Sequence, residues 1–158
     1  MDTSDRSIQF NSDGICHHCL DYKRVIKPRL NDQVYNANKL KKIIATIKST
    51  SKGNEYDCLI GLSGGLDSSY LVYTAKKYGL NPLIFHADTG WNSKLSSSNI
   101  EKLITNLDLD LFTYVIDWSE MKDIQLSFFK SGVPHIDSPQ DHSIFAAIYQ
   151  HAKKFKIK

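Results

Sequence analysis

The stretch Ser63-Gly64-Gly65-Leu66-Asp67-Ser68-Ser69 decides the fold, because it follows a short apolar run and precedes an amphipathic segment. Two consecutive glycines let the backbone turn sharply and bring its N–H groups close to a bound anion. The helix that follows points its positive N-terminal end at the same place, and the serine hydroxyls add donors. The carboxylate of Asp67 suits a site that also holds Mg²⁺. We interpret the stretch as a phosphate-binding turn; the alternative is an ordinary strand-to-helix turn with Asp or Ser as the helix cap.

Apolar runs and amphipathic segments alternate on both sides of this turn. Strands are expected at 56–62, 83–87 and 111–116, and helices at 67–78, 96–107, 119–130 and 141–154. This alternation predicts right-handed crossovers and a parallel sheet with helices on its faces, which is an α/β fold. Ligands of such sheets bind at the carboxyl ends of the strands, so the residues that follow Leu62, Ala87 and Ile116 are the candidates for a site.

The first 30 residues have a different pattern. Asp13-Gly14 marks a turn before Cys16-His17-His18-Cys19, and Pro28 closes the segment. Helical spacing of apolar residues begins at Asp32. We therefore predict two regions, a Cys-x-x-Cys segment at 1–30 and a nucleotide-binding region at 31–158. The spacing of Cys16 and Cys19 lets two thiolates hold one metal ion, but a single pair supplies only half of a zinc site.

Composition excludes several classes of protein. The chain has 158 residues, 41% hydrophobic and 23% charged, which is ordinary for one folded domain. A net charge of +3 is too small to indicate nucleic acid. No apolar run approaches the ~20 residues of a membrane-spanning helix, and no signal-peptide core is present. Three cysteines do not make a disulfide framework, and Cys58 is expected to be a core residue. These features favour a cytoplasmic protein.

The stretch that begins at Ser63 resembles the SGGxDS signature of the PP-loop ATP pyrophosphatase superfamily, which includes NAD synthetases and tRNA thiolation enzymes. The resemblance implies a Rossmann-like fold that splits ATP into AMP and pyrophosphate with Mg²⁺. It also implies that a substrate oxygen is adenylated and then displaced by a nitrogen or sulfur nucleophile. By this resemblance Ser63 and Asp67 act in catalysis, and residues 63–69, His86 and Asp88 bind ATP.

Two further stretches narrow the choice: the first follows the second expected strand, where adenine or substrate would lie, and the second precedes the last expected helix. They are Phe85-His86-Ala87-Asp88-Thr89-Gly90-Trp91-Asn92-Ser93 and Pro134-His135-Ile136-Asp137-Ser138-Pro139-Gln140-Asp141-His142. Together with residues 13–19, they are similar to the N-acetyl sugar amidotransferases (WbpG/PseA-type) of bacterial surface-polysaccharide synthesis, such as lipopolysaccharide O-antigen.

This second resemblance implies that the N-acetyl group of a nucleotide-linked sugar becomes an acetamidino group. Ammonia would come from a separate glutaminase through a cyclase-like partner, and a homodimer is compatible with the scheme. Substrate contacts would come from Gly90, Trp91, Asn92, Asp141 and His142.

Several of the candidate residues also have a plain structural interpretation. Trp91 can anchor its loop instead of stacking on a ligand. His86 can be a buried histidine whose hydrogen bonds are satisfied, and Asp141 and His142 can simply cap a helix. Asp88 is assigned to the site because it ends a parallel strand beside the turn.

The same resemblance suggests that the chain is truncated. The family pattern carries an earlier Cys-x-x-Cys before a Met-Asp-Thr-like stretch, whereas this chain begins at Met1 and stops at Lys158, just past a helix. We therefore expect weak or no zinc binding, mobility in the first ~20 residues and little activity of the chain alone.

Two other functions stay open. A PP-loop tRNA thiolation enzyme should have a catalytic cysteine and a basic face. Cys58 is weak support for the catalytic cysteine, and a net charge of +3 is weak support for the basic face. A non-catalytic nucleotide-binding or scaffold domain would bind ATP without turnover.

Overall fold

The structure is a computed structural model that describes residues 2–31 and 33–157. The chain divides into two compact units, Met1–Ile43 and Ile44–Lys158. The division lies inside helix α3 (Gln33–Thr50), whose last turns belong to the second unit. A boundary near residue 30 remains a prediction, and each unit is described by itself below.

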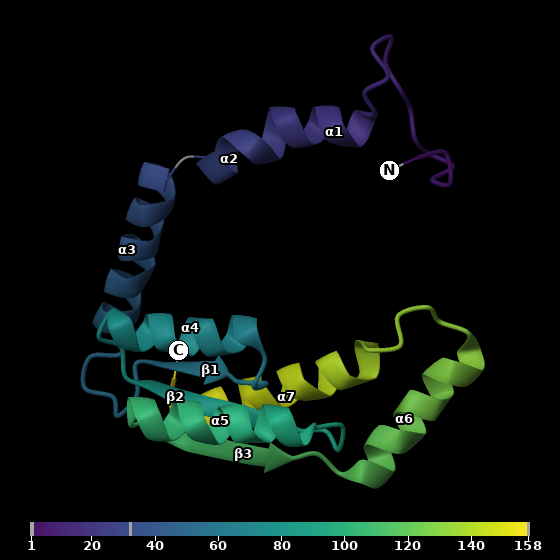
Figure 1. Cartoon of the computed structure of the whole chain (residues 1–158). Coiled ribbons are helices and arrows are strands. Elements are labelled where there is room, and N and C mark those ends of the chain that lie inside the picture. Colours follow the sequence, from purple (N-terminus) through teal and green to yellow (C-terminus); the bar gives the residue numbers. More distant parts are fainter. Residues whose placement is uncertain (1, 32, 158) are drawn as a thin grey trace. The chain divides into compact units, whose positions relative to one another are not determined.

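The second unit is built on a parallel sheet of three strands in the order β1-β2-β3. The strands are β1 (Cys58–Gly61), β2 (Pro82–Asp88) and β3 (Leu111–Val115), and the helices are α4 (Leu66–Lys77), α5 (Lys94–Leu107), α6 (Trp118–Ser131) and α7 (Ser138–Lys154). In the register, Leu59 pairs with Leu83, and Phe85 pairs with Phe112. All three strands point the same way, so their carboxyl ends meet at one edge (Figure 1).

Helices cover both faces of this sheet. Because the strands follow one another in spatial order, the right-handed crossovers place α4 and α5 on the same face. The core on that face is formed by Ile60, Leu62, Val72, Ala75, Leu80, Ile84, Ile100 and Leu109. Successive residues of a strand point to opposite faces, so Phe85 faces the other way. There it contacts His151 of α7, with ring centroids 5.2 Å apart.

The predicted strands and helices of this unit are confirmed, with differences at their ends. β1 is shorter than expected because Asp57 uses its carboxylate to hold a loop. Its Oδ1 accepts from the Ser51 hydroxyl at 2.7 Å, and its Oδ2 accepts from the Asn81 N–H at 2.8 Å. α6 begins earlier than expected, at Trp118, because Asp117 caps it. α7 also begins earlier, at Ser138, with a proline in its first turn, where the missing N–H costs nothing.

The first unit is more helical than its sequence suggested. Helical backbone runs through α1 (His17–Asp21), a π-helical turn η1 (Tyr22–Ile26) and α2 (Lys27–Asn31). The expectation that Pro28 closes the segment is wrong. Pro28 is the second residue of α2, and the wider turn before it is consistent with its missing N–H, which cannot donate to an earlier carbonyl.

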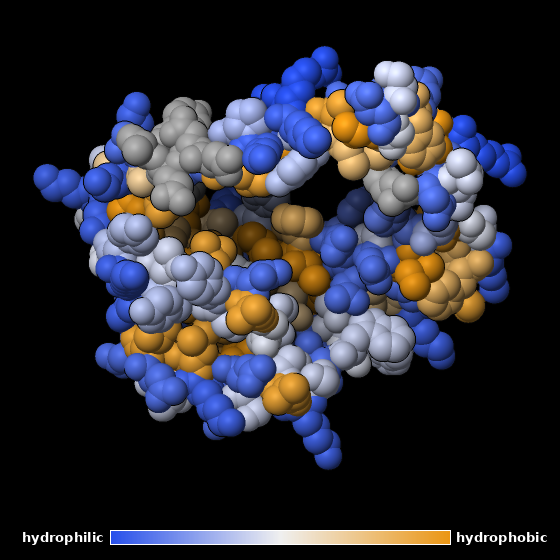
Figure 2. Space-filling model, turned by 45° about the horizontal axis from the view of Figure 1, so that its top comes forward, coloured by the Kyte–Doolittle hydropathy of each residue, from blue (hydrophilic) through white to orange (hydrophobic). Residues whose placement is uncertain are grey.

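The face shown in Figure 2 carries hydrophilic side chains, in blue, with hydrophobic patches, in orange, between them. On α4, Leu66 is 84% exposed and Tyr70 is 67% exposed. The first turn of α4 is therefore open to solvent. Within residues 2–31 and 33–157, no helix has the length and apolar character that crossing a bilayer requires.

Candidate functional site

Residues 63–69, which comprise the end of the loop after β1 and the first turn of α4, form a compact turn that we call the glycine turn. Gly64 adopts a φ of +78°, a conformation that favours glycine. The Ser63 N–H donates to the Ser68 hydroxyl at 3.3 Å, and the two hydroxyls lie 3.0 Å apart. The Ser68 hydroxyl also donates to the Gly65 carbonyl at 3.3 Å. Serine side chains thus fix the turn from within.

The glycine turn packs tightly against the start of α5. A Cβ atom at Gly64 would lie 2.3 Å from the Ser96 carbonyl oxygen, so only glycine fits. The Asn99 side chain donates to the Gly64 carbonyl at 3.0 Å and holds the turn from the same side. Neither Ser96 nor Asn99 was singled out from the sequence, because this contact joins segments about 30 residues apart.

Each of the three strands is followed along the chain by a helix, α4, α5 or α6, and these three helices differ in how their first N–H groups are satisfied. In α5, the Ser93 side chain accepts from the Ser96 N–H at 3.1 Å. In α6, Asp117 Oδ1 accepts from the N–H groups of Ser119 at 2.8 Å and Glu120 at 3.1 Å. At the start of α4 stands Gly65, which has no side chain with which to cap that helix. The first N–H groups of α4 have no acceptor within the helix, so they are donors for an anion.

At the end of β2, His86 ties the two neighbouring loops together. Its Nδ1–H donates to the Leu62 carbonyl at 2.8 Å, because a carbonyl can only accept. Its Nε2 then accepts from the Asn92 side chain at 3.1 Å. The ring is 9% exposed. His86 therefore fits the alternative interpretation, a buried histidine with both nitrogens satisfied, although it also lines the cavity described below.

Asp88 follows on the same edge and organises the loop after β2. Its Oδ1 accepts from the Gly90 N–H and from the Asn92 side chain, both at 2.9 Å. Asn92 thus bridges Asp88 and His86. Of Asp88, Gly90 and Asn92, only Asn92 lines the cavity described below, and the roles of all three toward a ligand stay predictions.

A cavity of about 240 Å³ lies at the carboxyl ends of β1 and β2. Its polar wall comes from the glycine turn, the loop after β2 and α7, with Ser63, Ser68, His86, Thr89, Asn92 and Gln140. Its apolar wall consists of Leu62, Phe85, Ile144 and Ile148. A concave site that combines apolar side chains with a few polar groups is typical of small-molecule and cofactor sites.

Other predicted residues lie outside this cavity. Asp67 is exposed in the first turn of α4, and Leu66 is exposed as well. Asp141 and His142 are exposed in the first turn of α7, where Asp137 occupies the cap position. They do not line the cavity, whereas Gln140 does. Sequence reasoning missed Gln140, Ile144 and Ile148 because helical spacing cannot show which face of α7 meets the sheet.

Trp91 and Gly90 lie beside a residue that sequence reasoning also missed. The ring centroids of Trp91 and Trp118 are 5.1 Å apart in an edge-to-face arrangement. Gly90 has a φ of +84°, and a Cβ atom there would lie 2.9 Å from the Trp118 ring. Because Trp118 is the first residue of α6, its position beside the loop after β2 depends on the pairing of β2 with β3.

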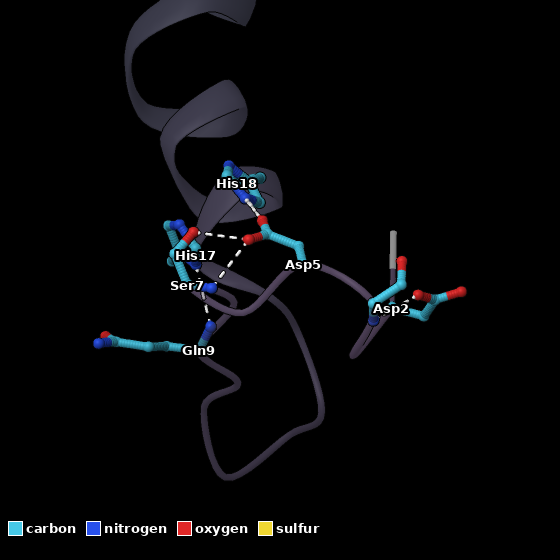
Figure 3. Close-up of polar contacts among 7 residues, drawn as sticks. Asp2, Asp5, Ser7, Gln9, His17 and His18 are labelled. Carbon is cyan, nitrogen blue, oxygen red and sulfur yellow. Dashed lines mark hydrogen bonds and ion pairs between the residues drawn. The ribbon is translucent and has the colours of Figure 1, made fainter.

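The Cys-x-x-Cys segment of the first unit does not form a metal site with its neighbours. Figure 3 shows that both intervening histidines point to other partners. His17 Nδ1 accepts from the Gln9 N–H at 3.1 Å, and His18 Nε2 donates to Asp5 Oδ2 at 2.9 Å. In the described ranges 2–31 and 33–157, no group of three or more His, Cys, Asp or Glu side chains could hold a metal ion. The assignment of zinc to Cys16 and Cys19 is therefore not supported.

The three thiols lie in different environments. Hydrogen bonds from the backbone N–H and the thiol of Cys19 lower the pKa of Cys16. The hydrogen bond between the two thiols raises the pKa of Cys19. Burial raises the pKa of Cys58 to about 11. Cys58 packs against the core, as predicted, and is a poor nucleophile at neutral pH.

Comparisons with known proteins support the fold. No family model and no curated protein matches the chain. Among solved structures, an NMN synthetase from Francisella tularensis is similar, with a TM-score of 0.56 and 21% identity over 73% of this chain and 49% of that one. An NH₃-dependent NAD synthetase from Campylobacter jejuni, solved in complex with nitrate, has a TM-score of 0.50 and 18% identity over 72% of this chain and 50% of that one.

These likenesses confirm the predicted α/β fold, a parallel sheet with flanking helices. The chain spans about half the length of each of these two proteins.

Proposed function

We propose that this chain forms the ATP-binding region of an amidotransferase that releases AMP and pyrophosphate. The observation that carries the proposal is the uncapped start of α4 behind a glycine turn. The neighbouring starts of α5 and α6 are closed by their own side chains. Donors left open at one helix start, at the ligand edge of a parallel sheet, suit the phosphates of a nucleotide.

The proposal places ATP at the site in one orientation. The glycine turn and the Ser63 and Ser68 hydroxyls would hold the phosphates. The adenine ring would enter the cavity between Phe85 and the α7 residues Ile144 and Ile148, where its flat faces meet apolar side chains. The α-phosphate would then lie near the end of β2, where a second substrate can reach it.

The residues of the turn also fit a Mg²⁺ ion. Asp67 is an exposed carboxylate in the first turn of α4, and Mg²⁺ is usually held by one or two carboxylates together with phosphate oxygens. Without such an ion, a carboxylate would repel the phosphates. The bound ion would neutralise the charge that develops on the departing pyrophosphate.

The proposed reaction begins at an amide oxygen. That oxygen attacks the α-phosphorus of ATP, the bond between the α-phosphorus and its bridging oxygen breaks, and pyrophosphate leaves. Ammonia then adds to the amide carbon and loses a proton. The carbon–oxygen bond breaks next, so AMP carries away the former amide oxygen and an amidine remains. Activation is needed because an amide oxygen is otherwise a very poor leaving group.

The acceptor we propose is the N-acetyl group of a nucleotide-linked sugar. Support comes from the resemblance of residues 85–93 and 134–142 to the N-acetyl sugar amidotransferases. The similar NAD synthetase is described as NH₃-dependent, which favours ammonia as the nucleophile. Ammonia would be supplied by a glutaminase acting through a cyclase-like partner.

Product analysis tests the proposal. The full-length gene product is incubated with ATP, Mg²⁺, ammonium and a panel of UDP-linked N-acetyl sugars, with bulk tRNA and a sulfur donor in parallel. We expect AMP and pyrophosphate with one sugar only, together with exchange of its amide oxygen for NH. Release of ADP and phosphate would contradict the proposed chemistry. Turnover with tRNA, or ATP binding with no turnover in any arm, would contradict the proposed acceptor.

A further inference from the structure

Two exposed tryptophans meet at the edge of the sheet where the candidate site lies. Trp91 belongs to the loop after β2, and Trp118 is the first residue of α6, after β3. Their rings meet edge to face, with an interplanar angle of 72°. Trp91 is 57% exposed and Trp118 is 47% exposed. The two rings form an aromatic corner with one open wall on each side, and we call it the tryptophan corner.

The corner is fixed in place by the backbone. Gly90 approaches the Trp118 ring so closely that a Cβ atom would lie 2.9 Å from Cε3 and 3.1 Å from Cζ3. The Ile116 N–H donates to the Asp88 carbonyl at 2.9 Å, which ties the end of β2 to the end of β3. Large aromatic surfaces that are held rigid and left exposed at a ligand-binding edge mark a binding site.

Each tryptophan follows an acidic residue along the chain at the carboxyl edge of the sheet. Asp88 precedes Trp91 in the loop, and Asp117 directly precedes Trp118. In the part of the chain that the structure describes, the hydrogen bonds of both carboxylates end on Oδ1. Each carboxylate therefore keeps Oδ2 as an acceptor for a hydroxyl group. Two carboxylates disfavour a phosphate at this place.

This combination selects one kind of ligand. The C–H groups on one face of a sugar ring carry slight positive charge and pack on the negative face of an indole. The hydroxyl groups around the same ring donate to carboxylates. We propose that the tryptophan corner binds the pyranose ring of the acceptor sugar, with Trp118 as a residue that determines specificity. The inference rests on the proposed function, because it assigns that acceptor a place.

Tryptophan fluorescence tests this inference directly, because Trp91 and Trp118 are the two tryptophans of the chain. The probes are UDP-N-acetylglucosamine, N-acetylglucosamine and UDP, titrated separately. We expect both sugars to change the emission and UDP alone to leave it unchanged. Trp118→Ala should weaken sugar binding at least ~10-fold, measured by calorimetry. Trp118→Phe, which keeps an aromatic face, should restore most of the affinity.

Phe129→Ala is the matched control, since Phe129 lies on the same helix and is 56% exposed. It should bind sugar like the unchanged protein, and circular dichroism verifies that every variant is folded. Equal losses in Trp118→Ala and Phe129→Ala would overturn the inference, as would a full response to UDP alone.

ATP binding, measured by equilibrium dialysis, separates the two proposals. ATP binding with no sugar binding would overturn the tryptophan corner and leave the nucleotide site standing. Sugar binding at the corner with no ATP binding would overturn the nucleotide site and leave the tryptophan corner standing.

Discussion

The starts of α4 and α6 both follow a strand of the parallel sheet, β1 and β3, yet their first N–H groups are satisfied differently. The first N–H groups of α6 are held by the carboxylate of Asp117, within 2.8 and 3.1 Å. α4 starts at Gly65 with no capping side chain. A capped start stabilises its own helix, whereas an uncapped start keeps its donors for a ligand. This difference in capping distinguishes a structural helix from a ligand-binding helix more clearly than the amino-acid composition of the two helices does.

The largest effect is expected from Gly64→Ala, which disturbs the packing of the glycine turn at the uncapped start of α4. A Cβ atom there would meet the Ser96 carbonyl at 2.3 Å in a backbone of φ +78°. We expect ATP binding to fall more than ~10-fold. The free energy of unfolding should drop by about 1–3 kcal/mol from overpacking, on top of the cost of the positive φ.

The control for that variant is Gly53→Ala. Gly53 has a φ of +88°, but a Cβ atom there would meet no atom of the described residues within 4 Å, so the variant isolates the backbone contribution. It should cost roughly 1–2 kcal/mol and leave ATP binding unchanged. Calorimetric Kd values and urea denaturation of both variants decide the matter, and equal ATP affinities would contradict a close-packed binding turn.

Gly65→Asp would give α4 the cap that α6 already has. The backbone of Gly65, with φ −81° and ψ 171°, accepts any residue, and a Cβ atom would find Ser63 Oγ at an ordinary 3.4 Å. We expect a gain of a few tenths of a kcal/mol in stability. ATP binding should weaken about 10-fold because the new carboxylate repels phosphate.

Gly65→Ser supplies a neutral cap and serves as the control for charge. Denaturation midpoints and ATP affinities are measured for both variants. If Gly65→Asp binds ATP as well as the unchanged protein, the start of α4 is not the phosphate site.

Asp117→Ala removes the cap of α6 and should lower the melting temperature without changing ATP affinity. Hydrogen bonds from Ser119 and then Glu120 lower the pKa of Asp117 below its usual 3.8. The carboxylate therefore contributes stability that is present above about pH 3.8 and is lost as the pH falls through the lowered pKa. Melting curves of the two proteins should differ at pH 7 and converge in acid. A constant difference at all pH values would show that the charge is irrelevant.

The smallest effect is expected from Ser93→Ala, which removes the single side-chain cap of α5. The Ser93 hydroxyl accepts from the Ser96 N–H at 3.1 Å, so its loss should cost about 0.5–1 kcal/mol. Ser97→Ala is the control, because Ser97 donates to the Ser93 carbonyl at 3.3 Å and caps nothing. Chemical denaturation resolves the two, and equal costs would argue against the capping role.

The order of strands and helices could be predicted from the sequence because it depends on the local spacing of apolar residues and glycines. Buried strands such as Leu83 to Phe85 are continuous apolar runs, and Gly79 closes a helix in the left-handed conformation. The glycine turn could also be predicted, since the glycines and serines that shape it lie within the same seven residues.

The rest of the site depends on contacts between distant segments. Trp118 meets Gly90 only after β2 and β3 have paired, and Ile144 reaches the cavity only because one face of α7 meets the sheet. In the first unit, the hydrogen bond between His18 and Asp5 joins residues that no periodicity relates. Spacing along a chain carries no information on such partners, so these residues had to be found in the structure.

The contact between Gly64 and Ser96 has a consequence for how this sequence can vary. The atoms nearest to a Cβ at position 64 are the oxygen, the carbonyl carbon and the Cα of Ser96, which every amino acid possesses. No substitution at position 96 can therefore make room for a side chain at position 64. In a saturation library of paired variants, position 64 should show no epistatic rescue by position 96, and glycine alone should survive selection for nucleotide binding.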